Sequence, residues 1–569
     1  MQHSSKFRLS QLLGYVWVCT LFVALLFSAH RVYRQSLMVE EFPYACDGFG
    51  YLTMAKQIRE ATAASHLPNF RFDSPQTQLL IAHLQSQNVP LASWDEMAAP
   101  HAHHYFPRAG YVGVQYPPGT GMLLALFPEG HAAHRLDFAV IALFCAIGAF
   151  ALVFAAVRRA WLAAGFSTLG IHLGLDVIGR MSGLSFSVNA VLAALLLTFA
   201  FIFIALELKA RDKMRGGSWA AAFIAGGCFG FAMLIRLDVI FLGPGLLVLL
   251  WPASWRKLFG DIAGAFGLGI AVCGVLPTIA YQQWFVGAWY LSAYNSRIVA
   301  YLGKNAPPKL DTLKHNVPFY LWAGDGSKDN WALALIVAGF AAAVWLRRVR
   351  GAHRLGFGWQ RLAWAALVLC GVPLAYFLTH QLTTPYYLVL PILTTILLFA
   401  FGSLLLETPI EIAESVDSAQ PLNLRALVLM LALLPGITVA ARALTQSEPP
   451  AQAESLPRSF ALPAELLDAR AWVYADLLTG TIWYYTKKPA YKIQFSNPET
   501  RAMLYKFAFE RGEPQYLIQD SAEMLNYIEE IKRLGGTLEP RGKVDGQPYF
   551  LIHWPEGGPV SEIAIKLSL

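Results

Sequence analysis

Charged residues are scarce in this chain of 569 residues. They make up 14% of the sequence, and hydrophobic residues make up 56%, whereas a soluble globular protein carries roughly 25% charged residues. Cysteine is also rare. Only six are present, and all except Cys46 lie in apolar runs, which argues against a disulfide framework. These shortages exclude an ordinary soluble domain and a small disulfide-stapled one.

In place of charge, the sequence has apolar runs of about 17–22 residues, each long enough to cross a bilayer as a helix. The first is followed by Arg31 and Arg34 without a small-residue cleavage pattern, so it is expected to remain as a span. We therefore predict a mainly α-helical, polytopic membrane protein with about eleven transmembrane helices. The predicted spans are 11–30, 136–157, 162–179, 184–206, 218–235, 238–252, 260–281, 330–346, 361–379, 385–406 and 424–443.

Lysine and arginine gather on one side of these predicted spans. Their clusters lie before the first span and after the second, fourth, sixth and eighth, and cytoplasmic loops carry such an excess. This distribution accounts for the net charge of +7, so no nucleic-acid partner is expected. The opposite side, which is expected to face the periplasm of a bacterial inner membrane, contains residues 31–135 and the C-terminus.

Two regions outside the spans are expected to fold. Residues 31–135 should form a large external loop with two or three short helices, one of them begun by the prolines of YPPGTGMLLALFPEG and too short to span. We divide the chain into 1–445 and a small periplasmic α/β domain, 446–569, which opens with a linker and is expected to assist acceptor binding or stability. Its predicted strands are RAWVYAD, GTIWYYT, QYLIQD and PYFLIHWP, and its predicted helices are 499–511 and 521–534.

Charges near the predicted spans are few and lie at span ends. Asp176 and Arg180 lie at the end of the third span, and Arg236 and Asp238 lie at the junction of the fifth and sixth, all on the predicted external side. An ion-coupled transporter usually keeps ionisable groups near the bilayer midplane. The pattern favours an enzyme whose site lies at the outer interface over the alternative of a transporter or lipid flippase.

Residues 1–406 contain, in order, an acid before YLTMA, then YPPGTGMLLAL, HRLDFAVIALF, AYQQWFVGAWYLSAY and PYYLVLPILTTILL. This order of motifs resembles the GT-C superfamily of membrane glycosyltransferases, although the last motif lacks the family's arginine. The nearest groups are the protein O-mannosyltransferases and the lipid A aminoarabinose transferase. The resemblance implies transfer of a hexose or pentose from a polyprenyl-phosphate donor to a cell-envelope lipid, glycan or protein, with no cofactor. A ligase that joins a whole glycan is the alternative within enzymes.

The implied reaction needs one carboxylate. A glycosidase needs two because its leaving alcohol must be protonated, whereas a polyprenyl phosphate leaves as a stable anion. The carboxylate would act as general base on the acceptor hydroxyl, with inversion at the anomeric carbon. The candidates in VEEFPYACDGFGYLTMA are Asp47, then Glu41 and Glu40. Gly48 and Gly50 would allow a close approach of substrate. Asp47 could also cap the helix that follows it.

The leaving phosphate needs cations, and arginine offers a planar fork of donors. The candidates are Arg108, Arg180, Arg236 and Arg297, each of which would alternatively be a membrane anchor. Tyr116 and Tyr294 are candidates for contact with sugar or prenyl chain, or members of an interfacial aromatic belt.

Three histidines lie close together in PHAHHYFPR, at positions 101, 103 and 104. A metal site normally has regular element geometry behind its ligands, and no such pattern is present. The histidines are therefore expected in a solvated loop, and no metal is predicted.

Overall fold

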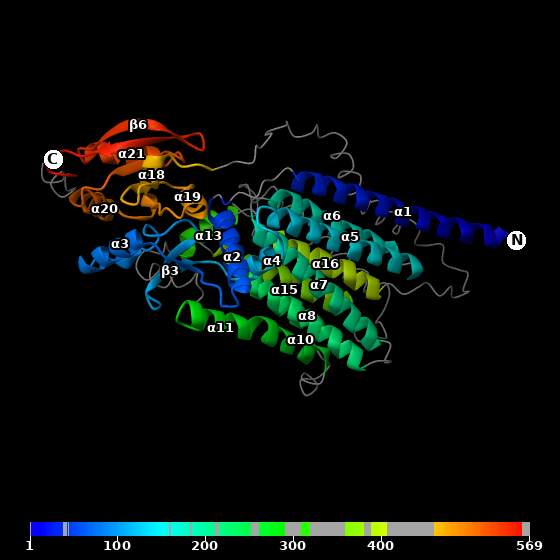
Figure 1. Ribbon diagram of the computed structural model, residues 1–569. Coiled ribbons are helices and arrows are strands. Elements are labelled where there is room, and N and C mark those ends of the chain that lie inside the picture. The colour runs from blue at the N-terminus through cyan, green and yellow to red at the C-terminus, as the bar shows by residue number, and fades with distance from the viewer. Residues whose placement is uncertain are drawn as a thin grey trace.

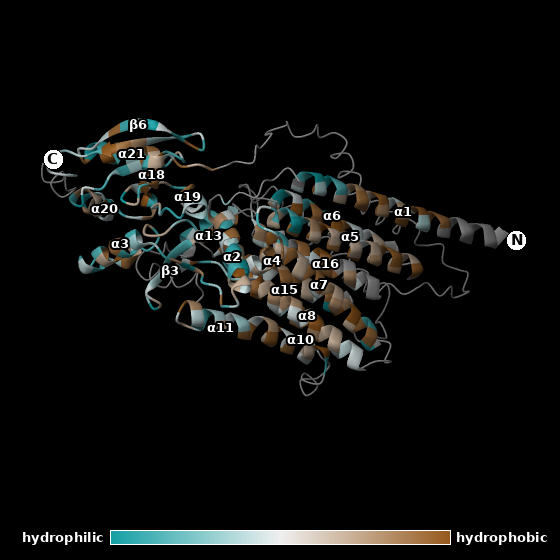
Figure 2. Ribbon diagram, viewed as in Figure 1, coloured by the Kyte–Doolittle hydropathy of each residue, from teal (hydrophilic) through white to brown (hydrophobic). Residues whose placement is uncertain are grey.

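The computed structural model describes residues 2–37, 43, 45–158, 161–182, 185–210, 215–251, 261–290, 309–318, 359–379, 389–406 and 460–559. Long helices lie side by side in a bundle, and the shorter helices and both sheets lie beyond one end of it (Figure 1). The N-terminus lies at the other end of the bundle. Hydrophobic residues dominate the bundle, whereas the outlying parts are mixed (Figure 2).

The bundle is built from nearly continuous apolar segments. Its helices are α1 (Gln2–Leu37), α5 (Ala132–Arg158), α6 (Trp161–Met181), α7 (Phe186–Ala210), α8 (Arg215–Ile235), α9 (Gly243–Leu250), α10 (Ile262–Ile270), α15 (Trp359–Leu378) and α16 (Val389–Leu406). A π-helical turn, Ala271–Val275, joins α10 to α11 (Leu276–Phe285), and a short helix α13 covers Lys309–Pro318.

Among the described residues, five helices are long and apolar enough to cross a membrane, which confirms a helical, multi-pass membrane architecture in this coarse form. They are Leu12–Ser36, Ala132–Val157, Phe186–Lys209, Gly216–Ile235 and Ile262–Phe285. The predicted spans 330–346 and 424–443 lie outside the described residues, so the count of eleven stays a prediction.

The predicted span 238–252 is wrong as a single helix. The chain there forms a 3-10 turn, η2 (Leu237–Leu242), followed by the eight-residue helix α9. Pro244 lies at the first turn of α9, where its missing N–H and fixed φ suit the start of a helix and not its interior.

The region between α1 and α5, which is predicted to be external and is called the external region below, contains a small sheet that the sequence did not predict. Its strands β1 (Arg71–Phe72), β3 (Tyr111–Val114) and β2 (His103–Phe106) pair antiparallel in that order. All positions of β2 and β3 are buried, so the sequence lacks the alternation that marks a half-exposed strand. The helices of this region are α2 (Ala45–Ala63), α3 (Pro75–Ser86), the 3-10 turn η1 (Leu91–Ser93) and the short α4 (Gly119–Ala125).

The C-terminal part, 460–559, has the expected α/β character. Its strands form one sheet in the order β4-β5-β7-β6, parallel between β4 and β5 and antiparallel elsewhere. The strands are β4 (Trp472–Tyr474), β5 (Gln515–Ile518), β6 (Thr537–Val544) and β7 (Gln547–His553), and the helices are α18 (Ala464–Leu467), α19 (Thr479–Thr486), α20 (Pro498–Glu510) and α21 (Met524–Arg533), with a 3-10 turn η8 (Ile493–Phe495).

Two details of this part differ from the prediction. The segment GTIWYYT is helix α19 and not a strand. Its buried face packs against α2, and this tertiary contact overrides the strand preference of threonine and aromatic residues. Strand β6 was missed because its side chains are almost all exposed, so it lacks an apolar face.

The external region and the C-terminal part share a hydrophobic core. Phe72, Leu80 and Trp94 of the external region belong to the same buried cluster as Trp472 and Tyr491. Side chains from both parts therefore exclude water from one another. The boundary predicted at 446 lies outside the described residues and stays a prediction.

Candidate functional site

Asp47 lies in the first turn of α2, where the chain has just left α1. Its Oδ1 accepts a hydrogen bond from the Tyr116 hydroxyl at 2.6 Å, and its Oδ2 accepts one from the Ser185 hydroxyl at 2.9 Å. Asp47 is the third residue of α2 and not the residue before it, so the N-cap interpretation is wrong. Each oxygen of the carboxylate is therefore bonded to a different segment, and both segments are distant from Asp47 in the sequence.

Tyr116 is buried, and its ring stacks on Tyr51 with 4.5 Å between centroids. Burial and the adjacent negative charge of Asp47 raise the Tyr116 pKa well above its ordinary value. The phenol therefore stays protonated and remains a donor to Asp47. A Cβ at Gly50 would lie 2.6 Å from the Tyr116 ring. The glycine expected to admit a substrate thus admits this tyrosine.

The turn between α6 and α7 links Asp47 to an arginine. Ser185 lies 3.1 Å from the Ser187 hydroxyl, which accepts a hydrogen bond from Arg236 Nη1 at 3.4 Å. Arg236 also donates to both oxygens of Asp238, at 3.0 and 2.7 Å, and both side chains are largely buried. Arg236 therefore lies in the same polar network as Asp47.

The segments that form this network all lie at one end of the bundle. Asp47 follows α1, Ser185 and Ser187 lie between α6 and α7, Arg236 follows α8, and Tyr116 precedes α4. Helix α4 packs on the end of α8 so closely that a Cβ at Gly119 would lie 2.7 Å from the Ile235 backbone nitrogen. This contact brings the segment of Tyr116 against that of Arg236.

A buried carboxylate that the sequence analysis missed lies near this turn. Asp137, near the start of α5, accepts hydrogen bonds from Ser182 at 2.6 Å and Asn189 at 2.7 Å. A charge in an apolar run was its signal, which went unused because Asp137 stood inside the HRLDFAVIALF motif. Ser182 and Asn189 gave no such signal in the sequence, because uncharged polar residues near the ends of spans are ordinary.

The other described arginine candidates contact different groups. Arg180 is exposed and pairs with Asp176 at 3.1 Å, as does Arg31. Arg108 is exposed, 5.3 Å from the Tyr290 ring centroid. These positions fit membrane-interface anchors. Glu40, Glu41, Arg297 and Tyr294 lie outside the described residues and stay predictions.

Cys46, adjacent to Asp47, accepts a hydrogen bond from Gln115 at 3.4 Å. Burial raises the pKa of the Cys46 thiol, which makes the nucleophilic thiolate scarce near neutral pH. The geometry therefore favours the carboxylate over the thiol as the reactive group in this turn.

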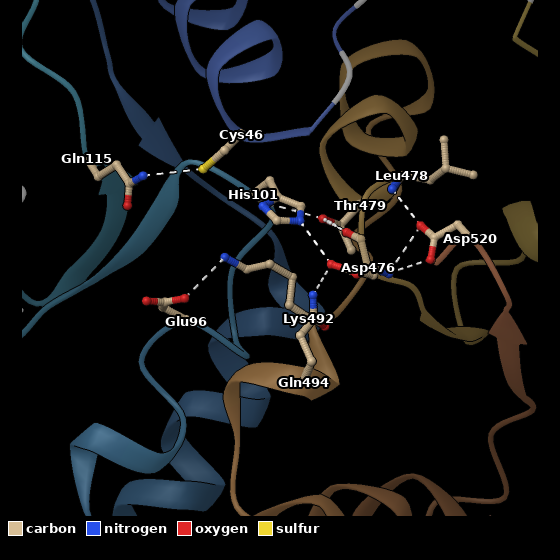
Figure 3. Close-up of polar contacts among 10 residues, drawn as sticks. All are labelled: Cys46, Glu96, His101, Gln115, Asp476, Leu478, Thr479, Lys492, Gln494 and Asp520. Carbon is tan, nitrogen blue, oxygen red and sulfur yellow. Dashed lines mark hydrogen bonds and ion pairs between the residues drawn. The ribbon is translucent and has the colours of Figure 1, made fainter. Parts of the chain in front are cut away.

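The three histidines are buried, so the prediction of a solvated loop is wrong. The C-terminal part covers them. His101 Nε2 lies 3.3 Å from Asp476 Oδ1, and His103 Nδ1 lies 3.0 Å from the His101 carbonyl oxygen. Nearby, Lys492 Nζ is 3.9 Å from Glu96 (Figure 3). Among the described residues, no three His, Cys, Asp or Glu side chains are arranged to hold a metal ion.

No protein-family model matches the chain, and the search of curated proteins found no match. Among solved structures, the chain is similar to the crystal structure of ArnT from Cupriavidus metallidurans in the apo state, with 14% identity and a TM-score of 0.41. The match covers 92% of this chain and 97% of that one. ArnT is a lipid A aminoarabinose transferase, the transferase type that the sequence motifs resemble. At this identity and TM-score, no residue role, donor or acceptor is carried over.

Proposed function

We propose that the chain is a membrane glycosyltransferase that moves a sugar from a polyprenyl-phosphate donor to a hydroxyl group of a cell-envelope acceptor. The observation that carries the proposal is the oriented carboxylate of Asp47 at the end of the bundle, in one network with Arg236. A base and a cation joined through two serines, at the end of an apolar helix bundle, suit an acceptor hydroxyl and a donor drawn from lipid.

Asp47 is the proposed general base. As the acceptor hydroxyl oxygen attacks the anomeric carbon, its proton passes to the Asp47 carboxylate. The new glycosidic bond forms while the bond from the anomeric carbon to the phosphate oxygen breaks, and its electron pair leaves with the polyprenyl phosphate. Attack opposite the leaving group inverts the anomeric centre. The hydrogen bonds from Tyr116 and Ser185 support this role because they fix the carboxylate without supplying a second acid.

Arg236 is the proposed ligand of the leaving phosphate. Its guanidinium is held by Asp238 through two hydrogen bonds and contacts Ser187, so its orientation is set before substrate binds. A planar guanidinium matches the oxygens of a phosphate better than an ammonium group does. Its connection to Asp47 through Ser187 and Ser185 favours Arg236 over Arg108 and Arg180.

The site is proposed to face the periplasm, with the lipid bilayer around the bundle. This proposal is supported by the lysine and arginine clusters, which lie on one side of the predicted spans. The Asp47–Arg236 network lies at the helix ends on the opposite side. A sugar pre-attached to a lipid phosphate also suits a compartment without nucleotide sugars, since the donor carries its own leaving group.

The test uses the purified full-length chain. The protein is incubated with donor lipids and a cell-envelope extract, both prepared from a strain that lacks its gene. Mass spectrometry then measures the masses of the donor lipids and of the envelope components. The proposal predicts release of free polyprenyl phosphate together with an envelope component that is heavier by one sugar. A transporter or flippase would leave the donor intact, and a glycan ligase would add an oligosaccharide; either outcome contradicts the proposal.

A further inference from the structure

We infer that the C-terminal part is a positioning part of the active site, which holds the first turn of α2, and with it Asp47, through Gly480 and Thr481 of α19. The inference rests on the proposed function of Asp47. It replaces the expectation that the C-terminal part only assists acceptor binding or stability. The contacts that carry it join α19 to the two segments that set the carboxylate in place.

The first contact is a close approach of α19 to α2. A Cβ at Gly480 would lie 2.4 Å from Cγ of Phe49, a fully buried ring two residues after Asp47. Real Cβ atoms do not lie this near a ring carbon, so glycine at 480 sets the spacing of the two helices. In the same turn, the Thr481 hydroxyl donates to the Pro43 carbonyl oxygen at 2.7 Å, across 438 positions of sequence.

The second contact reaches the partner of Asp47. The His101 backbone N–H donates to the Thr479 hydroxyl at 3.2 Å, and the next residue, Ala102, accepts from the Gln115 N–H at 2.8 Å. Gln115 immediately precedes Tyr116. The N-terminal end of α19 therefore supports the segment that carries the Tyr116 hydroxyl to Asp47. Figure 3 shows His101 and Thr479 at this contact, with Gln115 on the neighbouring segment.

The start of α19 is itself fixed within the C-terminal part. Asp520 accepts hydrogen bonds from the backbone N–H groups of Asp476, at 2.9 and 3.1 Å, and Leu478, at 2.6 Å. Asp520 is buried, so these bonds are shielded from water. Helix α19 is therefore bonded to Asp520 on one side, and it contacts the start of α2 and His101 on the other. These contacts make it a suitable support for the Asp47 carboxylate, whose position affects the rate.

The test is Gly480→Ala in the full-length chain. Alanine is a better helix former than glycine, so the substitution does not weaken α19 itself. The added methyl group must push Phe49 and the first turn of α2 away. The control is Gly557→Ala, in the same part of the chain, where a Cβ would meet nothing within 4 Å.

Each variant is expressed in the deletion strain at equal membrane levels, and the initial rate at which the missing envelope sugar reappears is measured by mass spectrometry. A misplacement near 1 Å can lower a rate about 100-fold, so we expect a loss of about that size in Gly480→Ala and none in Gly557→Ala. The double variant Gly480→Ala/Phe49→Leu, which makes room for the methyl group, should recover most of the rate, which general misfolding would not allow.

Hydrogen exchange of the purified variants supplies a readout that does not depend on transfer. Faster exchange confined to the start of α2 and to residues 101–116 in Gly480→Ala supports the inference. Unchanged exchange and an unchanged rate overturn it. If the deletion strain loses no sugar, the proposed function fails, while the exchange data still decide whether α19 holds α2.

Discussion

At the scale of single residues, the sequence singled out Asp47 and Tyr116 as separate candidates, but it did not predict that they contact each other. An acid directly before a glycine and an aromatic helix, just after a span, is unusual enough to be seen in sequence. Tyr116 and Ser185 lie 69 and 138 positions away, and only the packing of helix ends brings them to the carboxylate. Arg236 was one of several arginine candidates, and its hydrogen bond to Ser187 in the turn between α6 and α7 is the reason that we propose it as the phosphate ligand.

The buried histidines give the protein a testable response to acid. Burial lowers the His103 pKa to about 4 and also lowers that of His101, whereas an unfolded histidine titrates near 6.5. Between pH 6.5 and 4, the His103 imidazole binds a proton in the unfolded chain but stays neutral in the folded chain. Stability should therefore fall as the pH falls through this window, by at most about 3 kcal/mol for His103.

The corresponding variant is His103→Gln, whose amide can still donate to the His101 carbonyl oxygen. Thermal unfolding of the detergent-solubilised protein, followed at pH 7 and pH 4.5, should show a smaller loss of stability in the variant than in the natural chain. An equal loss in both would assign the acid response to other groups.

At the scale of elements, strongly apolar helices were predicted well, and elements shaped by tertiary contacts were not. Helices α5, α7 and α8 follow from long apolar runs. Strands β2 and β3 are buried on both faces and lack a pattern, and α19 is a helix because its small residues pack on α2. The 3-10 turn before α9 replaced a predicted span because Pro244 favours a helix start.

One contact between elements should control the site. At Gly119 of α4, an added Cβ would lie 2.7 Å from backbone atoms of Leu234 and Ile235 in α8, which cannot move as a side chain can. Gly119→Ala should displace the segment of Arg236, cost about 1–3 kcal/mol of stability, and lower transfer.

The matched control is Gly216→Ala in α8, where a Cβ would meet nothing within 4 Å. Unfolding midpoints and envelope sugar are measured for both variants. Equal behaviour of the two would show that the α4–α8 contact does not set the site.

At the scale of the whole molecule, the external region and the C-terminal part form one body over the end of the bundle. Charge patterning predicts that this body faces the periplasm. Gln87 and Lys506 are exposed on its two halves. Cysteines placed at these positions should both react with a membrane-impermeant thiol reagent in intact spheroplasts, with the natural chain as the control. Labelling of either position only after lysis would contradict the orientation.

The most direct test of the account is the rate of sugar transfer by Asp47→Asn in the deletion strain. Asparagine keeps the size of the side chain and an oxygen that can accept the hydrogen bond from Tyr116. It cannot take up the proton of the hydroxyl group that receives the sugar. Loss of a general base lowers a rate by about 100- to 10,000-fold, and we predict a loss in this range at an unchanged membrane level of the protein. Near-normal transfer by Asp47→Asn would contradict the account, and a large loss in Glu41→Gln or Glu40→Gln would then move the base to that residue.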